Sequence, residues 1–164
     1  SAYLITFVCY GSWLPGQPGA VDRKQNVFGS RLPQPDSKAQ ARAASRMKQE
    51  PYLLDAIRRE VVLRSLQQVC LHSEWTLLAA HVRTNHVHVV VAAQQSAEQV
   101  MTTFKAYGSR ALNGMALDKA ERKRWARHGS TRHLWTKQAV SPAVHYVVWK
   151  QVEPMASFEM PTTR

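Results

Sequence analysis

The alternation of apolar and polar residues divides the chain into segments with the periods of strands and of helices. Residues 3–10 are rich in β-branched and aromatic side chains and stop at Gly11, which predicts a central strand. Residues 75–82 and 87–92 predict two more strands, and the short polar turn between them favours an antiparallel hairpin. A further short strand is expected at 134–136.

Helical periodicity predicts four helices, at 38–49, 53–72, 96–113 and 141–151. Pro51 separates the first two. Ser96 and Gln99 form the pattern of a capping box at the start of the third, and Gly114 closes it. Pro142 suits the first turn of the fourth helix.

The order of these elements predicts an α+β fold, with one antiparallel sheet and helices packed on it. The helix at 53–72 carries the apolar stripe expected to face the sheet, formed by Ile57, Val61, Leu66, Val69 and Cys70. Without a repeat or a long polar linker, residues 1–164 are expected to form a single domain. Residues 11–37, rich in Gly and Pro, predict a long ordered loop, and 153–164 a C-terminal tail.

The charge balance favours a polyanionic partner, because 22 Lys and Arg residues against 11 Asp and Glu residues leave a formal net charge of +11. A merely basic, well-solvated surface is the alternative. The densest basic patch is interleaved with aromatic residues and suits single-stranded or hairpin DNA; its candidates are Arg122, Lys123, Arg124, Trp125, Arg127 and Arg132. Lys38, Arg42 and Arg46 share one helix face and form a second candidate track.

Cysteine content and hydropathy indicate a cytoplasmic protein. Cys9 and Cys70 are too few for a disulfide framework and lie among apolar residues, where free cysteines pack as small hydrophobes. No apolar run approaches the roughly 18 residues that a membrane span needs, so we expect no membrane partner.

His86 and His88 are the strongest candidates for metal binding. In a strand they point to the same side, with Cβ atoms about 7 Å apart, while Val87, Val89 and Val91 face the opposite, apolar layer. Two imidazoles so placed could bind a divalent cation such as Mg²⁺ or Mn²⁺, with phosphate oxygens and water as further ligands. Two unrelated histidines are the alternative reading.

Other metal and triad chemistries fit less well. Histidine-triad hydrolases need a third histidine two residues after His88, where this chain has Val90. Zinc is disfavoured, because the cysteines lack metal-binding spacing and the chain contains no H-E-x-x-H helix. Tyr146 shares a helix face with Lys150, but on its own it reads as an interfacial aromatic residue.

Taken together, these motifs resemble the single-tyrosine HUH transposases, which include small insertion-sequence transposases and repeat-associated tyrosine transposases. The combination of the His-x-His strand, the downstream tyrosine and the Y-G-S-W-L-P-G turn carries the resemblance. The matching segments span nearly the whole chain in order: 4–7, 10–16, 22–29, 83–88, 127–132 and 146–148.

The resemblance implies a ferredoxin-like sheet with the His-x-His motif on a central strand and the reactive tyrosine on the C-terminal helix. It implies a metal-dependent endonuclease and strand transferase that acts on single-stranded, hairpin-bearing DNA in DNA transposition. His86 and His88 would bind Mg²⁺ or Mn²⁺, and Tyr146 would form a 5′-phosphotyrosine and release a 3′-hydroxyl. A bacterial-type cytoplasmic protein, associated with the nucleoid when it acts on DNA, is expected. Both a monomer and a homodimer occur among such proteins.

The chain departs from the family pattern after the tyrosine. A polar metal ligand commonly follows the tyrosine by four residues, where this chain has Lys150. The nearest amide is Gln151, which we take as the third metal ligand, and Lys150 as a phosphate contact. Trp13 and Arg23 are candidate DNA contacts in the long loop.

Two alternatives remain open at the level of sequence. Tyr107 could be the nucleophile, although a packing or base-stacking role fits it better. A domesticated nucleic-acid-binding protein that keeps the fold and charge but no longer cleaves DNA is the alternative function.

Overall fold

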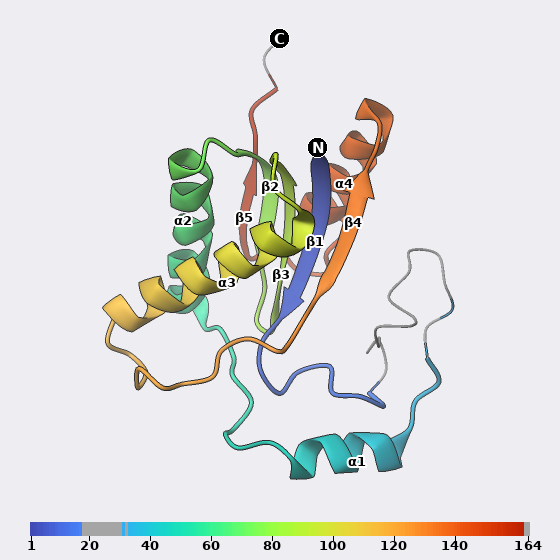
Figure 1. Ribbon diagram of the computed structural model, residues 1–164, viewed down its shortest axis with the longest axis vertical. Helices are drawn as coiled ribbons and strands as arrows, with labels where there is room; N and C mark the ends of the chain where they lie inside the picture. Colours follow the sequence, from blue (N-terminus) through green and yellow to red (C-terminus); the bar gives the residue numbers. More distant parts are fainter. Residues whose placement is uncertain (18–30, 32, 163–164) are drawn as a thin grey trace.

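A single antiparallel sheet organises the part of the chain that the computed structural model describes, residues 1–17, 31 and 33–162 (Figure 1). The strand order is β4-β1-β3-β2-β5, which places β3 at the centre. The strands are β1 (Ala2–Val8), β2 (Thr76–Val82), β3 (His86–Ala92), β4 (Ser130–Leu134) and β5 (Ala156–Glu159). The helices are α1 (Ser37–Ser45), α2 (Ala56–His72), α3 (Ala97–Gly114) and α4 (Lys137–Trp149).

The two faces of the sheet are covered by different helices (Figure 1). α2 and α3 pack on one face, over a core that includes Phe7, Phe104 and the odd-numbered valines of β3. α4 packs on the other face through Ala143 and Val147, against Ala79 and Val90. The predicted α+β fold is confirmed, and the order β4-β1-β3-β2 around α2 and α3 is ferredoxin-like.

α4 begins four residues earlier than the sequence predicts. Thr136 caps it by accepting a hydrogen bond from the Ala139 amide, so Pro142 lies inside the helix rather than in its first turn. The helix also ends at Trp149, which leaves Gln151 beyond its C-terminus. β4 likewise covers 130–134 instead of 134–136, because its polar residues pair with β1 at the edge of the sheet.

The expected tail contains β5, which pairs antiparallel with the outer edge of β2. Of its four residues only Ala156 is buried, so the segment shows little of the apolar alternation of a strand. The expected loop at 11–37 lies largely outside the described residues, and α1 starts at its end, capped by Asp36.

α2 starts at Ala56, three residues later than predicted, because Asp55 accepts the Arg58 amide as N-cap. Leu53 and Leu54 belong to an extended connection instead, in which the Leu54 amide donates to the Thr84 carbonyl. Ile57 is 58% exposed and does not belong to the buried stripe. Among the described residues no helix is long and apolar enough to cross a membrane.

Candidate active site

His86 and His88 converge on the face of the sheet that α4 covers. Their ring centroids lie 4.7 Å apart, with the rings nearly perpendicular. The intervening Val87 points to the opposite face and is fully buried in the α2 and α3 core. Valines on one face of β3 and histidines on the other thus alternate along the strand, as the sequence pattern predicts.

Nδ1 of each imidazole lies within hydrogen-bond distance of a neighbouring side-chain oxygen. Nδ1 of His86 lies 2.7 Å from the Asn85 side-chain oxygen, and Nδ1 of His88 lies 2.7 Å from the Thr6 hydroxyl. With the proton on Nδ1 in both rings, each Nε2 carries a lone pair. This is the arrangement by which neighbouring hydrogen bonds orient histidines as metal ligands.

Burial keeps both imidazoles uncharged at neutral pH. Removal from water lowers the pKa of His86 to about 4 and that of His88 to about 3, with nearby positive charge as a smaller cause. Within the described residues, no group of three or more His, Cys, Asp or Glu side chains could hold a metal ion. The pair therefore fits a divalent cation whose other ligands are water, phosphate oxygens or an amide.

Tyr146 lies beside this pair. Its ring centroid is 5.7 Å from that of His88, and 46% of the residue is exposed. The neighbouring Val147 is fully buried against the sheet, which sets the rotation of α4 about its own axis. Tyr146 therefore lies at the edge of the contact between α4 and the sheet. An accessible phenol therefore adjoins two uncharged imidazoles.

Trp13 forms another wall of the site. Its ring centroid lies 4.8 Å from that of His86, and 37% of the residue is exposed. The turn that brings it there includes Gly11 at φ 81° and Trp13 itself at φ 48°, in the left-handed region. A side chain at Gly11 would collide with Met47 and Pro51.

The two residues after α4 both donate hydrogen bonds to its last turn. Lys150 is the exposed C-cap residue. The Gln151 side-chain amide donates to the Tyr146 backbone carbonyl at 3.0 Å, which leaves its carbonyl oxygen as the group that could bind a cation. Tyr107 is on α3, packed against the core on the other face of the sheet, so it does not adjoin the histidines.

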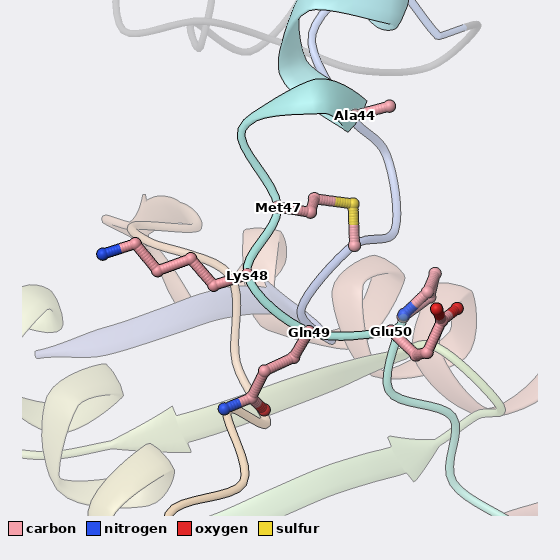
Figure 2. Close-up of a pocket in the computed structure, with 6 residues that line it drawn as sticks. Ala44, Met47, Lys48, Gln49 and Glu50 are labelled. Carbon is pink, nitrogen blue, oxygen red and sulfur yellow. The ribbon is translucent and has the colours of Figure 1, made fainter.

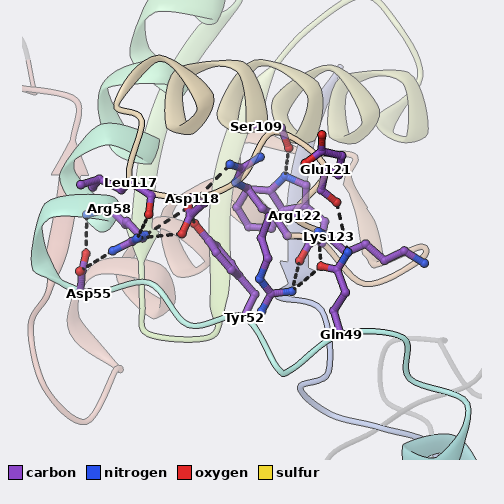
Figure 3. Close-up of polar contacts among 12 residues, drawn as sticks. Gln49, Tyr52, Asp55, Arg58, Ser109, Leu117, Asp118, Glu121, Arg122 and Lys123 are labelled. Atoms are coloured by element: carbon purple, nitrogen blue, oxygen red, sulfur yellow. Dashed lines mark hydrogen bonds and ion pairs between the residues drawn. The ribbon is translucent and has the colours of Figure 1, made fainter.

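The predicted DNA-binding segment divides into buried and exposed residues. Figure 3 shows Arg122 and Lys123 of this segment with their polar contacts. Arg124 has only 2% of its side chain exposed and lies 3.6 Å from an Asp118 oxygen, which corrects the prediction that it contacts DNA. Trp125 is half-buried against Phe7, and its ring N–H donates to the Lys105 backbone carbonyl and the Ser109 hydroxyl. Its ring is therefore not an open surface on which a base could stack.

The remaining candidates differ in how accessible they are. The Arg122 guanidinium donates hydrogen bonds to the Gln49 side-chain oxygen and to the backbone carbonyl of Glu50. Lys123 and Arg127 are exposed. Arg132 is half-buried and lies in register with Leu4, on the face that carries the histidines. Arg23 lies outside the described residues.

A surface pocket of about 460 Å³ lies near the end of α1, lined by residues 44 and 47–51 (Figure 2). Neither the histidine pair nor Tyr146 lines it. Sequence reasoning missed Thr6 and His81, which lie beside His88 on the face of the sheet that α4 covers, here called the histidine face, and it missed the contact of Asn85 with His86. Strand register is the signal that could have found the first two, since both pair with His88.

Comparison with known proteins identifies the family of the chain and a solved structure of similar fold. Residues 37–148, more than half of the chain, match the family described as "Transposase IS200 like". A solved structure of a REP-associated tyrosine transposase bound to a REP hairpin has a similar fold, with a TM-score of 0.51 and 8% sequence identity. That match covers 91% of this chain but only 65% of the other. No curated protein gives a significant match. On the family match, which includes both histidines and Tyr146, this chain belongs to the IS200-like transposases.

Proposed function

We propose that this protein cleaves and rejoins single-stranded DNA, with Tyr146 as the nucleophile and His86 and His88 as ligands of Mg²⁺ or Mn²⁺. The observation that supports this most is the convergence of an exposed phenol and two lone-pair-bearing imidazoles on one face of the sheet. Gln151 is proposed as an amide ligand, through the oxygen that its bond to Tyr146 leaves available.

The chemistry is a pair of phosphoryl transfers at one phosphorus. The Tyr146 oxygen loses its proton and bonds to phosphorus, the bond from phosphorus to the 3′ oxygen breaks, and that oxygen leaves as a 3′-hydroxyl with a proton from solvent. A second 3′-hydroxyl then loses its proton to solvent and bonds to the same phosphorus, the bond from phosphorus to the Tyr146 oxygen breaks, and that oxygen takes a proton from solvent. Each step exchanges one ester for another, so rejoining needs no ATP.

A free phenol has a pKa of about 10 and is a weak nucleophile at neutral pH. A bound divalent cation would polarise the phosphate and offset the charge that develops on it. The chain contributes the two uncharged imidazoles that would hold such a cation, and α4, which holds the phenol beside them.

Hairpin-bearing DNA is the proposed substrate. The solved structure of similar fold is described with a REP hairpin, and this chain carries a formal charge of +11. The exposed residues Lys123, Arg127 and Lys150, together with Arg132, are the proposed backbone contacts.

Covalent capture tests the nucleophile. Wild-type protein incubated with hairpin-bearing single strands and Mn²⁺ should give a protein–DNA adduct on a denaturing gel. Tyr146→Phe should lose the adduct, because the attacking oxygen is gone, but should bind the same DNA with nearly unchanged affinity. Tyr107→Phe is the matched control, and it should keep both properties.

An adduct that persists in Tyr146→Phe would contradict the assignment of the nucleophile. Wild-type protein that binds hairpin DNA tightly but gives no adduct with either cation would contradict the enzymatic proposal. That result would favour the alternative, a domesticated nucleic-acid-binding protein.

A further inference from the structure

His81 lies on the histidine face of the sheet without belonging to the His-x-His motif. It lies on β2, directly opposite His88 in the strand register, and is fully buried. Thr6, His88 and His81 therefore form one row across three neighbouring strands. The proposed chemistry uses the first two residues of the row and leaves the third without a role.

Both ring nitrogens of His81 bond to backbone atoms outside the sheet. Nδ1 lies 2.9 Å from the carbonyl oxygen of Val147, the residue after the proposed nucleophile. Nε2 accepts a hydrogen bond of 2.9 Å from the amide of Met155, in the segment that leads into β5. An amide can only donate, so Nε2 must be the acceptor, and Nδ1 must carry the proton that it donates to Val147.

The Val147 carbonyl needs this donor. α4 ends at Trp149, so the carbonyls of its last turn have no helical amide four residues ahead. The Tyr146 carbonyl is satisfied by the Lys150 amide and the Gln151 side chain. The buried Val147 carbonyl is satisfied by His81.

The direction of Tyr146 is set through the backbone of α4, whose last turn is also tied to β5 by the Trp149 indole N–H, which donates to Glu159. Ala143 and Val147 are the two buried residues of α4. Within the described chain, the Tyr146 hydroxyl makes no hydrogen bond to the protein. The orientation of the phenol is therefore set by where the backbone of the last turn of α4 is held.

We propose that His81 is a positioning residue, which holds the last turn of α4 on the sheet so that Tyr146 faces the His86 and His88 pair. This proposal rests on the proposed function for its catalytic consequence, while the bond itself can be tested without activity. A nucleophile displaced by about 1 Å can lose roughly 100-fold in rate.

Replacing His81 with Asn or with Gln should remove one of its two hydrogen bonds and keep the other. Asn places an amide N–H near the position of Nδ1, so His81→Asn should keep the bond to Val147 and lose that to Met155. Gln reaches the position of Nε2 with its oxygen, so His81→Gln should keep the bond to Met155 and lose that to Val147. Each variant loses one buried bond, which makes the pair a matched comparison.

At saturating hairpin DNA, His81→Gln should form adduct about 100-fold more slowly than wild type, while His81→Asn stays within about tenfold. The DNA dissociation constant should be the same for all three proteins, because His81 is buried and cannot touch DNA. Equal losses in the two variants, or full activity of His81→Gln, would overturn the proposal.

Two measurements do not need cleavage. Hydrogen exchange of the Lys150 amide should be faster in His81→Gln than in His81→Asn, because only the former releases the last turn. In ¹⁵N-histidine-labelled wild type, NMR should show His81 with its proton on Nδ1. A proton on Nε2 would overturn the proposal even if both variants failed to fold. Wild type that gives no adduct but shows the predicted exchange and tautomer would contradict the proposed function and leave the role of His81 in holding α4 supported.

Discussion

Single side chains set up the proposed metal site through atoms that do not themselves bind the cation. The Asn85 oxygen and the Thr6 hydroxyl each occupy Nδ1 of one histidine, so both rings present the same nitrogen, Nε2, to a ligand. Because burial keeps both rings uncharged near neutral pH, a cation need not compete with a proton for that nitrogen.

Removing either ring should abolish divalent-ion-dependent cleavage. His86→Ala and His88→Ala each leave one imidazole, which cannot hold a hard cation against water, so we expect adduct yield to fall at least about 100-fold. EDTA should do the same to wild type. The measurement is adduct formation over a Mn²⁺ titration, with the exposed His72 changed to Ala as the control.

Full adduct yield from His86→Ala or His88→Ala in the presence of EDTA would rule out the metal mechanism. A control variant that loses activity would instead point to a general effect of removing a histidine.

At the scale of elements, the basic segment between α3 and β4 contains buried and exposed residues that the sequence does not distinguish. Arg124 and Trp125 point inward and attach the segment to the core, while Lys123 and Arg127 remain exposed. Charge density alone predicts a uniform DNA-binding surface. The buried position of Arg124 depends on Asp118, a tertiary partner that local spacing cannot reveal.

A salt titration should separate the two groups. Binding to a single-stranded hairpin oligonucleotide should weaken with a log–log slope of roughly −0.7 per phosphate contact, so Lys123→Ala and Arg127→Ala should each flatten the slope by about that amount. Arg124→Ala should destabilise the fold but leave the slope of the folded fraction unchanged. Tyr146→Phe is a second control with an unchanged slope.

If the double variant at Lys123 and Arg127 keeps the wild-type slope, this segment does not contact DNA. The face of α1 with Lys38, Arg42 and Arg46 would then be the next surface to test.

The elements that could be predicted from the sequence are those whose pattern is local. The β2 and β3 hairpin, the capping box of α3 and the opposite faces of the β3 valines and histidines all follow from period and spacing. The start of α4 could not be predicted, because Pro142 suggested a first turn, while Thr136 supplies the actual cap. β5 could not be predicted either, because its stability comes from pairing with β2 rather than from its own apolar content.

At the scale of the whole molecule, Asp118 joins parts of the chain that are distant in sequence (Figure 3). Its carboxylate accepts hydrogen bonds from Arg58 of α2 and from the Tyr52 hydroxyl, and it lies near Arg124. The pKa of Asp118 lies below its usual value, mainly because the carboxylate accepts a hydrogen bond from Arg58. This network connects the 119–127 segment to the helical layer.

Asp118 should make the stability of the fold sensitive to acid. Its pKa is lower in the folded than in the unfolded chain, so its contribution is full above the unfolded value of about 3.9 and is lost as pH falls through the folded value. Asp118→Asn should therefore unfold at lower urea concentration at pH 7, by roughly 3 kcal/mol, because it leaves the buried Arg124 guanidinium without its carboxylate, while Arg58 keeps its ion pair with Asp55. The difference from wild type should shrink below about pH 4.

Urea unfolding at pH 7, 5 and 3 measures this, with the exposed Glu60 changed to Gln as the control. A gap between wild type and Asp118→Asn that stays constant over this range would show that the carboxylate contributes no pH-dependent stability.

β3 also restricts how this protein can change over evolution. The valines that fill the core and the histidines on the opposite face alternate along one strand, so a one-residue insertion or deletion within it would exchange the two sets. Imidazoles would enter the apolar core, and valines would face Tyr146. A descendant that stays folded must therefore preserve the length of β3 and its register against β1 and β2, so that within this strand the histidines can change only by substitution.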